Sequence, residues 1–171
     1  MIVLGLDPGS RRFGWGLISK SGTRLVHVDH GVIETDTRGT FAARLVAIEK
    51  RLVEVINEYK PDCAGMESLF FAKDAQAAAK LGHARGVALL VCAREGLSIG
   101  EYAPTHVKRA VAGGGRAEKA QMAQMVRALL NLSEVPQLDA SDALAIAITH
   151  SQHLPLIEAT RAAKATSPRC Q

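Results

Sequence analysis

Cysteine and aromatic residues are scarce in this sequence, and long apolar runs are missing. The three cysteines, Cys63, Cys92 and Cys170, are far apart and lack metal-ligand spacing, which argues against a disulfide scaffold and predicts thiols in a reducing compartment. No apolar run approaches the length of a membrane span. Asp7 interrupts the first run too early for a secretory signal, and no basic segment precedes it. We therefore expect a cytoplasmic protein without a membrane partner.

The composition that remains is that of one globular domain. The chain has 171 residues, of which 47% are hydrophobic and 22% charged, enough for one sizeable core and too few for two ordinary domains. We assign residues 1–156 to a single domain. Residues 157–171 are rich in alanine, threonine, serine and basic groups, which predicts a flexible basic tail.

The positive charge is concentrated in one stretch. The net charge of +4 permits a polyanionic partner without requiring one. Between Pro104 and Leu130 there is a single acid, Glu118, and the basic residues are Lys108, Arg109, Arg116, Lys119 and Arg127. Such a stretch is typical of a surface that follows a phosphate backbone, although a solvated helix face would have the same composition.

Hydrophobic periodicity predicts an α/β fold with a five-stranded mixed sheet flanked by helices. Strands are expected at about residues 2–6, 13–18, 25–34, 63–66 and 98–102, and helices at about 41–59, 74–94, 104–112, 117–130 and 139–153. The first three strands follow one another through short connections and should be antiparallel. The helix at 41–59 makes the next connection a crossover, so the strand at 63–66 should lie parallel to the first strand and beside it.

Two glycines, Gly82 and Gly86, lie inside the predicted helix at 74–94. A glycine in a helix interior costs about 1 kcal/mol relative to alanine, so the pair suggests that another element approaches closely. Core packing within the monomer and a helix-to-helix contact in a dimer both satisfy this, and the sequence leaves the two open.

Four carboxylates fall where an apolar element begins or ends. Asp7 directly follows the first strand, and Glu67 follows the strand at 63–66. Because parallel neighbours finish at the same sheet edge, these two acids should be close in space. Asp139 and Asp142 are three apart and share one face in the first turn of the last helix. Ordinary structural roles are the alternative, because Asp7 could open a turn and the helical pair could complement the helix dipole.

A group of carboxylates without cysteine or histidine partners favours a hard cation such as Mg²⁺ or Mn²⁺. Two such ions can activate a water on one side of a phosphodiester and stabilise the leaving oxygen on the other. The six histidines are scattered along the chain and are expected on surfaces or helix faces. Acids of this kind in a basic chain predict metal-dependent chemistry on a nucleic acid.

The sequence resembles the RuvC-type Holliday-junction resolvases, a family of crossover junction endodeoxyribonucleases with an RNase H-like fold, over about residues 1–153. The resemblance rests on four blocks in this order: GLDPGSRRFGWG, MESLFFAKDAQAAAKLGHARG, VKRAVAGGGRAEKAQM and DASDALAIAITH. It implies that catalytic Mg²⁺ ions, two per site with Mn²⁺ as a substitute, are held by four acids, which are Asp7, Glu67, Asp139 and Asp142. It also implies that Phe70 stacks on a junction base and that Lys108 and Lys119 contact DNA near the scissile phosphate. Arg116 and Lys73 are further candidates for DNA backbone contacts.

The function implied by the resemblance is the resolution of four-way (Holliday) junctions in homologous recombination and DNA repair. Paired symmetric nicks near the crossover would leave 5′-phosphate and 3′-hydroxyl ends. A homodimer that includes the helix at 74–94 would match the symmetry of the junction, and the branch-migration proteins RuvA and RuvB are expected partners. Stacking of an aromatic ring on a base is worth about 1–3 kcal/mol. Burial under the neighbouring helix is the alternative for Phe70 or Phe71.

Three other functions share parts of this pattern. The DPGSRRFGWG stretch also resembles the phosphate loop of actin-like sugar kinases and chaperone ATPases, which need two such domains around a nucleotide. A non-catalytic junction-binding protein could use the same scaffold, and a related RNase H-like nuclease could act on RNA. ATP hydrolysis, binding without cutting, and a preference for RNA would identify these functions in turn.

Overall fold

The computed structural model describes residues 1–68 and 74–166, with side chains up to Leu154. Its strands are β1 (Ile2–Asp7), β2 (Arg12–Ser21), β3 (Arg24–Glu34), β4 (Cys63–Glu67) and β5 (Ser98–Tyr102). Its helices are α1 (Phe41–Tyr59), α2 (Ala75–Arg94), α3 (Pro104–Ala112), α4 (Lys119–Leu129) and α5 (Leu138–Thr166). The order of elements is the one that hydrophobic periodicity predicts.

The five strands form one mixed sheet in the order β3-β2-β1-β4-β5. β1 pairs antiparallel with β2, which pairs antiparallel with β3, whereas β4 lies parallel to β1 and β5 parallel to β4. The predicted crossover is therefore confirmed. Leu6 is the register partner of Met66, so the acids that follow them, Asp7 and Glu67, come at the same edge of the sheet.

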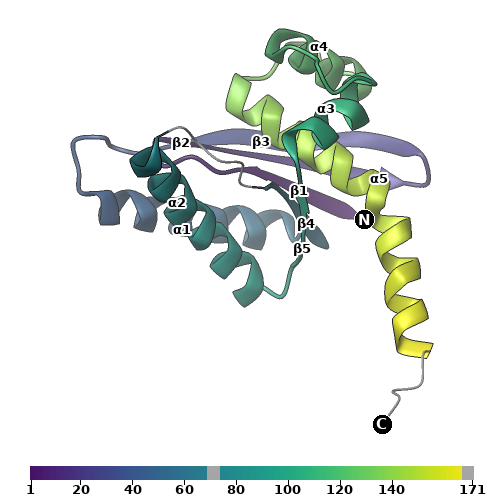
Figure 1. Cartoon of the computed structure of the whole chain (residues 1–171), viewed down its shortest axis with the longest axis horizontal. Coiled ribbons are helices and arrows are strands. Elements are labelled where there is room, and N and C mark those ends of the chain that lie inside the picture. Colours follow the sequence, from purple (N-terminus) through teal and green to yellow (C-terminus); the bar gives the residue numbers. More distant parts are fainter. Residues whose placement is uncertain (69–73, 167–171) are drawn as a thin grey trace.

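Helices cover both faces of the sheet. α1 and α2 lie on one face, while α5 lies across the other with α3 and α4 beyond it (Figure 1). Alternation along β1 serves both layers, because Leu4 and Leu6 belong to the core under α1 and α2, and Val3 belongs to the core under α5. Thr40 caps α1 by accepting a hydrogen bond from the Ala43 N–H at 3.1 Å.

A row of glycines lets α5 lie directly on the sheet. Gly16, Gly5, Gly65 and Gly100 are register partners on the four strands β2, β1, β4 and β5. A Cβ atom on Gly5 would lie 2.0 Å from the Ala143 carbonyl oxygen, and one on Gly65 would lie 2.9 Å from the Cβ of His150. Side chains at these positions would push the helix away, so the row fixes the height of α5 above the sheet.

The last helix is longer than the sequence predicts, because α5 continues to Thr166 instead of ending near His153. Pro155 has no N–H with which to bond the Ser151 carbonyl, and proline usually ends or bends a helix for this reason. Here Lys20 Nζ from β2 donates to that carbonyl. The division into a domain at 1–156 and a flexible tail stays a prediction. Within the described residues, no helix is both long and apolar enough to span a membrane.

Candidate active site

Two of the four predicted acids, Asp7 and Glu67, end neighbouring parallel strands. Asp7 is the last residue of β1 and Glu67 the last residue of β4, and the negative charge of Glu67 acts on Asp7. Arg85 of α2 holds the Glu67 backbone in place, because its Nη1 donates to the Glu67 carbonyl oxygen at 2.6 Å. The expected proximity of the two carboxylates is therefore seen in the structure.

The first turn of α5 brings the other two acids, Asp139 and Asp142, over the same edge. A Cβ on Gly14, the register partner of Asp7, would lie 2.0 Å from the Asp139 carbonyl oxygen. The start of the helix thus rests on β2 beside the end of β1. The structure brings together the four acids that lie far apart in the sequence.

The electrostatics of this cluster are unfavourable to its negative charge. Burial, followed by the charges of Asp142, Glu67 and Asp139, raises the pKa of Asp7 to about 8. Burial also raises the pKa of Glu67 and of Asp142, and the positive charges of Lys119 and Lys108 oppose this rise in both. Carboxylates that repel one another in a half-buried site call for cationic partners.

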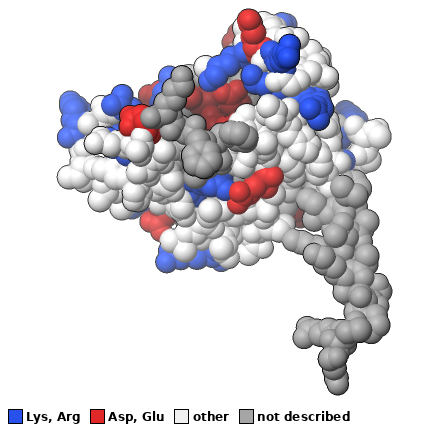
Figure 2. Space-filling view, viewed as in Figure 1, with Lys and Arg blue, Asp and Glu red and all other residues white. Residues whose placement is uncertain are grey.

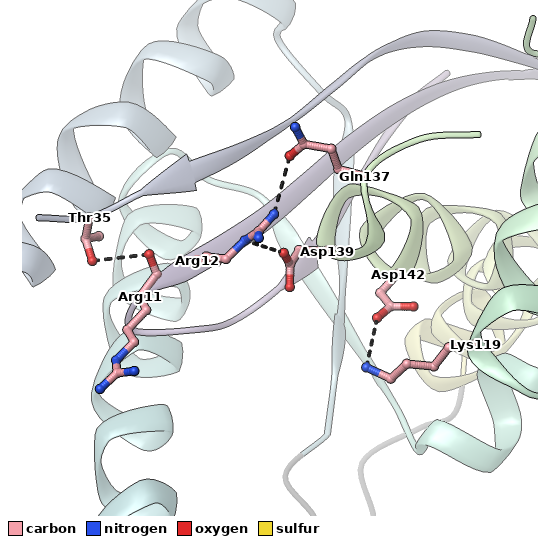
Figure 3. Close-up of polar contacts among 7 residues, drawn as sticks. All are labelled: Arg11, Arg12, Thr35, Lys119, Gln137, Asp139 and Asp142. Carbon is pink, nitrogen blue, oxygen red and sulfur yellow. Dashed lines mark hydrogen bonds and ion pairs between the residues drawn. The ribbon is translucent and has the colours of Figure 1, made fainter. Parts of the chain in front are cut away.

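Two of the acids have basic partners within the protein. Arg12 Nε of β2 lies 2.7 Å from Asp139 Oδ2, and Lys119 Nζ of α4 lies 3.8 Å from Asp142 Oδ2 (Figure 3). In this arrangement, no three side chains of His, Cys, Asp or Glu within the described ranges are close enough together to hold one ion. The carboxylates converge, but Asp139 and Asp142 are turned toward these cations.

A pocket of about 270 Å³ opens beside the cluster. The residues that line it are Glu67, Pro104, Val107, Lys108, Lys119, Met122, Asp142, Ala145 and Ile146. Both lysines singled out in the sequence, Lys108 on α3 and Lys119 on α4, thus face two of the acids. Figure 2 shows acidic atoms recessed in a hollow with basic side chains along its upper border. Such a site can accommodate a phosphate between acids and lysines.

Of the other predicted DNA contacts, Arg116 lies in the part of the chain that the structure describes. Arg116 is exposed in the loop between α3 and α4, outside the set of described residues that line the pocket. Phe70 and Lys73 lie outside the described residues.

Two arginines were missed by the sequence analysis as site residues. Arg12 bonds Asp139, and Arg85 supports Glu67 while pairing with Glu101 across the top of β5. Arg85 is buried, and an arginine in the middle of the alanine-rich helix α2 was the available signal for it. Nothing in the sequence around Arg12 indicated a site residue. Arg12 meets Asp139 only because α5 packs on β2.

Comparison with known proteins decides the family. Residues 3–150 match the model of the family "Crossover junction endodeoxyribonuclease RuvC". A protein of that name from Sorangium cellulosum is 59% identical over 169 residues, which cover 99% of this chain and 94% of the relative. This chain belongs to the RuvC family. It is therefore a member of a family of endodeoxyribonucleases, and membership implies dependence on a divalent metal ion.

Solved structures agree with membership of the RuvC family. Thermus thermophilus RuvC in complex with a Holliday junction substrate has a TM-score of 0.86 and 34% identity, covering 91% of this chain and 96% of that one. A yeast mitochondrial Holliday junction resolvase has a TM-score of 0.67 at 15% identity, covering 93% of this chain and 81% of that one, which supports the fold alone. The predicted RNase H-like architecture is confirmed.

Proposed function

We propose that this protein resolves four-way DNA junctions by paired, symmetric, metal-dependent nicks that leave 5′-phosphate and 3′-hydroxyl ends, in homologous recombination and DNA repair. The observation that carries the proposal is the convergence of Asp7, Glu67, Asp139 and Asp142 beside a pocket that contains Lys108 and Lys119. The Thermus thermophilus relative was solved with a Holliday junction substrate. Membership of the same family supports the same class of substrate here.

The donor set fits a hard divalent ion. All four acids offer carboxylate oxygens. Burial and their mutual repulsion together raise the pKa of Asp7 to about 8, and bound cations would relieve the repulsion. We assign Mg²⁺, two ions per site with Mn²⁺ as a substitute, to these four acids. Bound there, the ions would supply activation of a water and stabilisation of the leaving oxygen.

The basic residues hold the substrate in this proposal. Lys108 and Lys119 line the pocket with Glu67 and Asp142, so their ammonium groups can pair with the phosphates that flank the scissile bond and orient it toward the acids. Arg116 and Lys73 are assigned to the DNA backbone farther along, and Phe70 to stacking on an unpaired base. A four-way junction suits such stacking because its bases are already partly unpaired.

A homodimer is part of the proposed function. The exposed face of α2 forms an apolar surface with part of α1, lined by Leu45, Ala79, Gly82, His83, Gly86, Val87 and Leu90. Among the described residues, a Cβ atom on Gly82 or Gly86 would meet nothing within 4 Å, so packing against the described part of the monomer does not explain the two glycines. This favours the alternative of a helix-to-helix contact between two copies. Location in the cytoplasm and contact with RuvA and RuvB stay predictions from the sequence.

The test is cleavage of a labelled synthetic four-way junction, compared with linear duplex, single-stranded DNA and an RNA duplex. We expect paired nicks in the junction alone, in Mg²⁺ and not in EDTA, with ends that a ligase reseals. Tight junction binding without cutting would indicate a binding protein instead. Preferential cutting of RNA would indicate a different nuclease activity, and ATP hydrolysis without any cutting would indicate an ATPase.

A further inference from the structure

Arg12 is joined to the start of α5 by two contacts. Its Nε lies 2.7 Å from Asp139 Oδ2, and its Nη2 donates to Gln137 Oε1 at 3.4 Å. Gln137 is itself part of the first helical turn, because its carbonyl oxygen accepts from the Ser141 N–H at 2.8 Å. The guanidinium is therefore held against the element that carries Asp139 and Asp142 (Figure 3).

The strand explains why Arg12 reaches this helix. Arg12 is the first residue of β2, and side chains two apart on a strand share a face. Gly14 is the position on which the backbone of Asp139 rests, since a Cβ there would be 2.0 Å from the Asp139 carbonyl oxygen. Arg12 consequently projects on the face where α5 begins, directly beside the acid cluster.

The pairing with Arg12 occupies one of the two carboxylate oxygens of Asp139, Oδ2, and so competes with a metal ion for that oxygen. An arginine keeps its charge at every relevant pH and orients a carboxylate through fixed N–H directions. One carboxylate oxygen cannot be turned toward this guanidinium and toward an ion between the acids at once. The side chain of Arg12 is 50% exposed, so it could exchange the carboxylate for another anion from solvent.

We propose that Arg12 is a positioning residue that competes with the divalent ion for the Asp139 carboxylate, so that ion binding releases its guanidinium for a DNA phosphate. This inference rests on the proposed function, because it takes Asp139 as a metal ligand. Ion binding and DNA binding then strengthen each other, and thermodynamic linkage requires the effect to be reciprocal.

The first test is calorimetric titration of Ca²⁺ into the full chain without DNA, because Ca²⁺ accepts oxygen ligands in flexible geometry. Removing a competing exposed ion pair in Arg12→Gln should tighten Ca²⁺ binding by about two- to fivefold. Arg12→Lys keeps the charge and should stay nearer to the wild type. Arg11→Gln is the matched control, because the Arg11 guanidinium points away from the acids (Figure 3), and it should leave the affinity unchanged.

Unchanged or weaker Ca²⁺ binding by Arg12→Gln would overturn the proposal. An equal gain in Arg11→Gln would also overturn it, because it would trace the effect to net charge. This titration contains no DNA, so its failure is distinct from a failure of junction cutting.

The second test is a gel-shift measurement of four-way junction binding in EDTA and in Ca²⁺, with the junction checked for intactness. Ca²⁺ should improve junction affinity more in the wild type than in Arg12→Gln, since the variant has no guanidinium to release. The same improvement in both proteins would overturn the coupling.

Discussion

At the scale of single residues, Asp7 holds the least favourable position in the site. It lies at the end of a buried strand and receives the negative charges of the other three acids, so its pKa rises to about 8. Among the residues that the structure describes, Lys119 is the one whose charge lowers this pKa. In its charged form, such an acid lowers the stability of the folded protein and favours the binding of cations. Functional acids often have this property.

This pKa predicts a stability change for Asp7→Asn. The folded pKa is about 8 and the ordinary value is 3.8, so between these values the native state binds the proton and the unfolded state does not. The free energy of unfolding must then fall as pH rises from about 4 to 8. Without divalent ions, the variant should be more stable than the wild type at pH 8, on the order of 5 kcal/mol at about 1.4 kcal/mol per pKa unit, and the two should converge near pH 4.

Urea unfolding in EDTA at a series of pH values measures this difference. Asp36→Asn is the control, because the pKa of Asp36 is lowered by hydrogen bonds from Arg38 and its removal should give no gain at pH 8. A difference between wild type and Asp7→Asn that does not grow with pH would contradict the interpretation.

At the scale of elements, the sequence predicted the pieces and their neighbours but not the height of α5 above the sheet. Apolar periodicity and one crossover are enough to place β4 beside β1, and with it Glu67 beside Asp7. The row of Gly16, Gly5, Gly65 and Gly100 exists only once the strands are in register, so reading along the chain cannot find it. The same is true of the Arg12 contact with Asp139, which depends on that packing.

Gly5→Ala tests whether this row positions the site. The added Cβ would lie 2.0 Å from the Ala143 carbonyl oxygen and 2.6 Å from the Ala147 nitrogen. Because both atoms are backbone, α5 must move, at a cost of about 1–3 kcal/mol, and Asp139 and Asp142 move with it. We expect a lower melting temperature together with a loss of junction cutting in the fraction that stays folded.

Gly39→Ala is the control for this prediction. Its Cβ would lie 3.5 Å from the Asp36 carbonyl oxygen, an ordinary contact in an exposed loop, so stability and cutting should be unchanged. Wild-type stability and cutting in Gly5→Ala would show that α5 is not positioned by the glycine row.

At the scale of the whole molecule, paired nicks require two sites, and the surface on α2 is where we expect the second copy. Leu90 is 49% exposed at this surface. A charge on this surface should separate the dimer, so Leu90→Glu should have the mass of a monomer by light scattering and should cut junction strands singly. Val26→Glu is the control, because Val26 is 43% exposed on β3, away from this surface, and it should remain a dimer. A monomeric wild type, or a dimeric Leu90→Glu variant, would contradict this assignment.

The fold could be predicted from the sequence because the order of strands and helices along the chain determines which strands are neighbours in the sheet. The four acids could be named because each one ends or begins an apolar element, which is a local property. The contacts of the basic residues with these acids are not a local property. Three separate elements carry Arg12, Lys108 and Lys119. Their distances to the acids depend on how α3, α4 and α5 pack on the sheet.

The most direct test of the account compares wild type with Asp7→Asn on an end-labelled four-way junction in Mg²⁺, measuring binding and cutting in the same samples, with Asp36→Asn as the control. We expect the variant to bind the junction and to cut it at least about 10³-fold more slowly, because it lacks one of the carboxylates that hold the ions. Cutting by Asp7→Asn at the wild-type rate would contradict the account. So would a wild type that binds junctions of many sequences and cuts none.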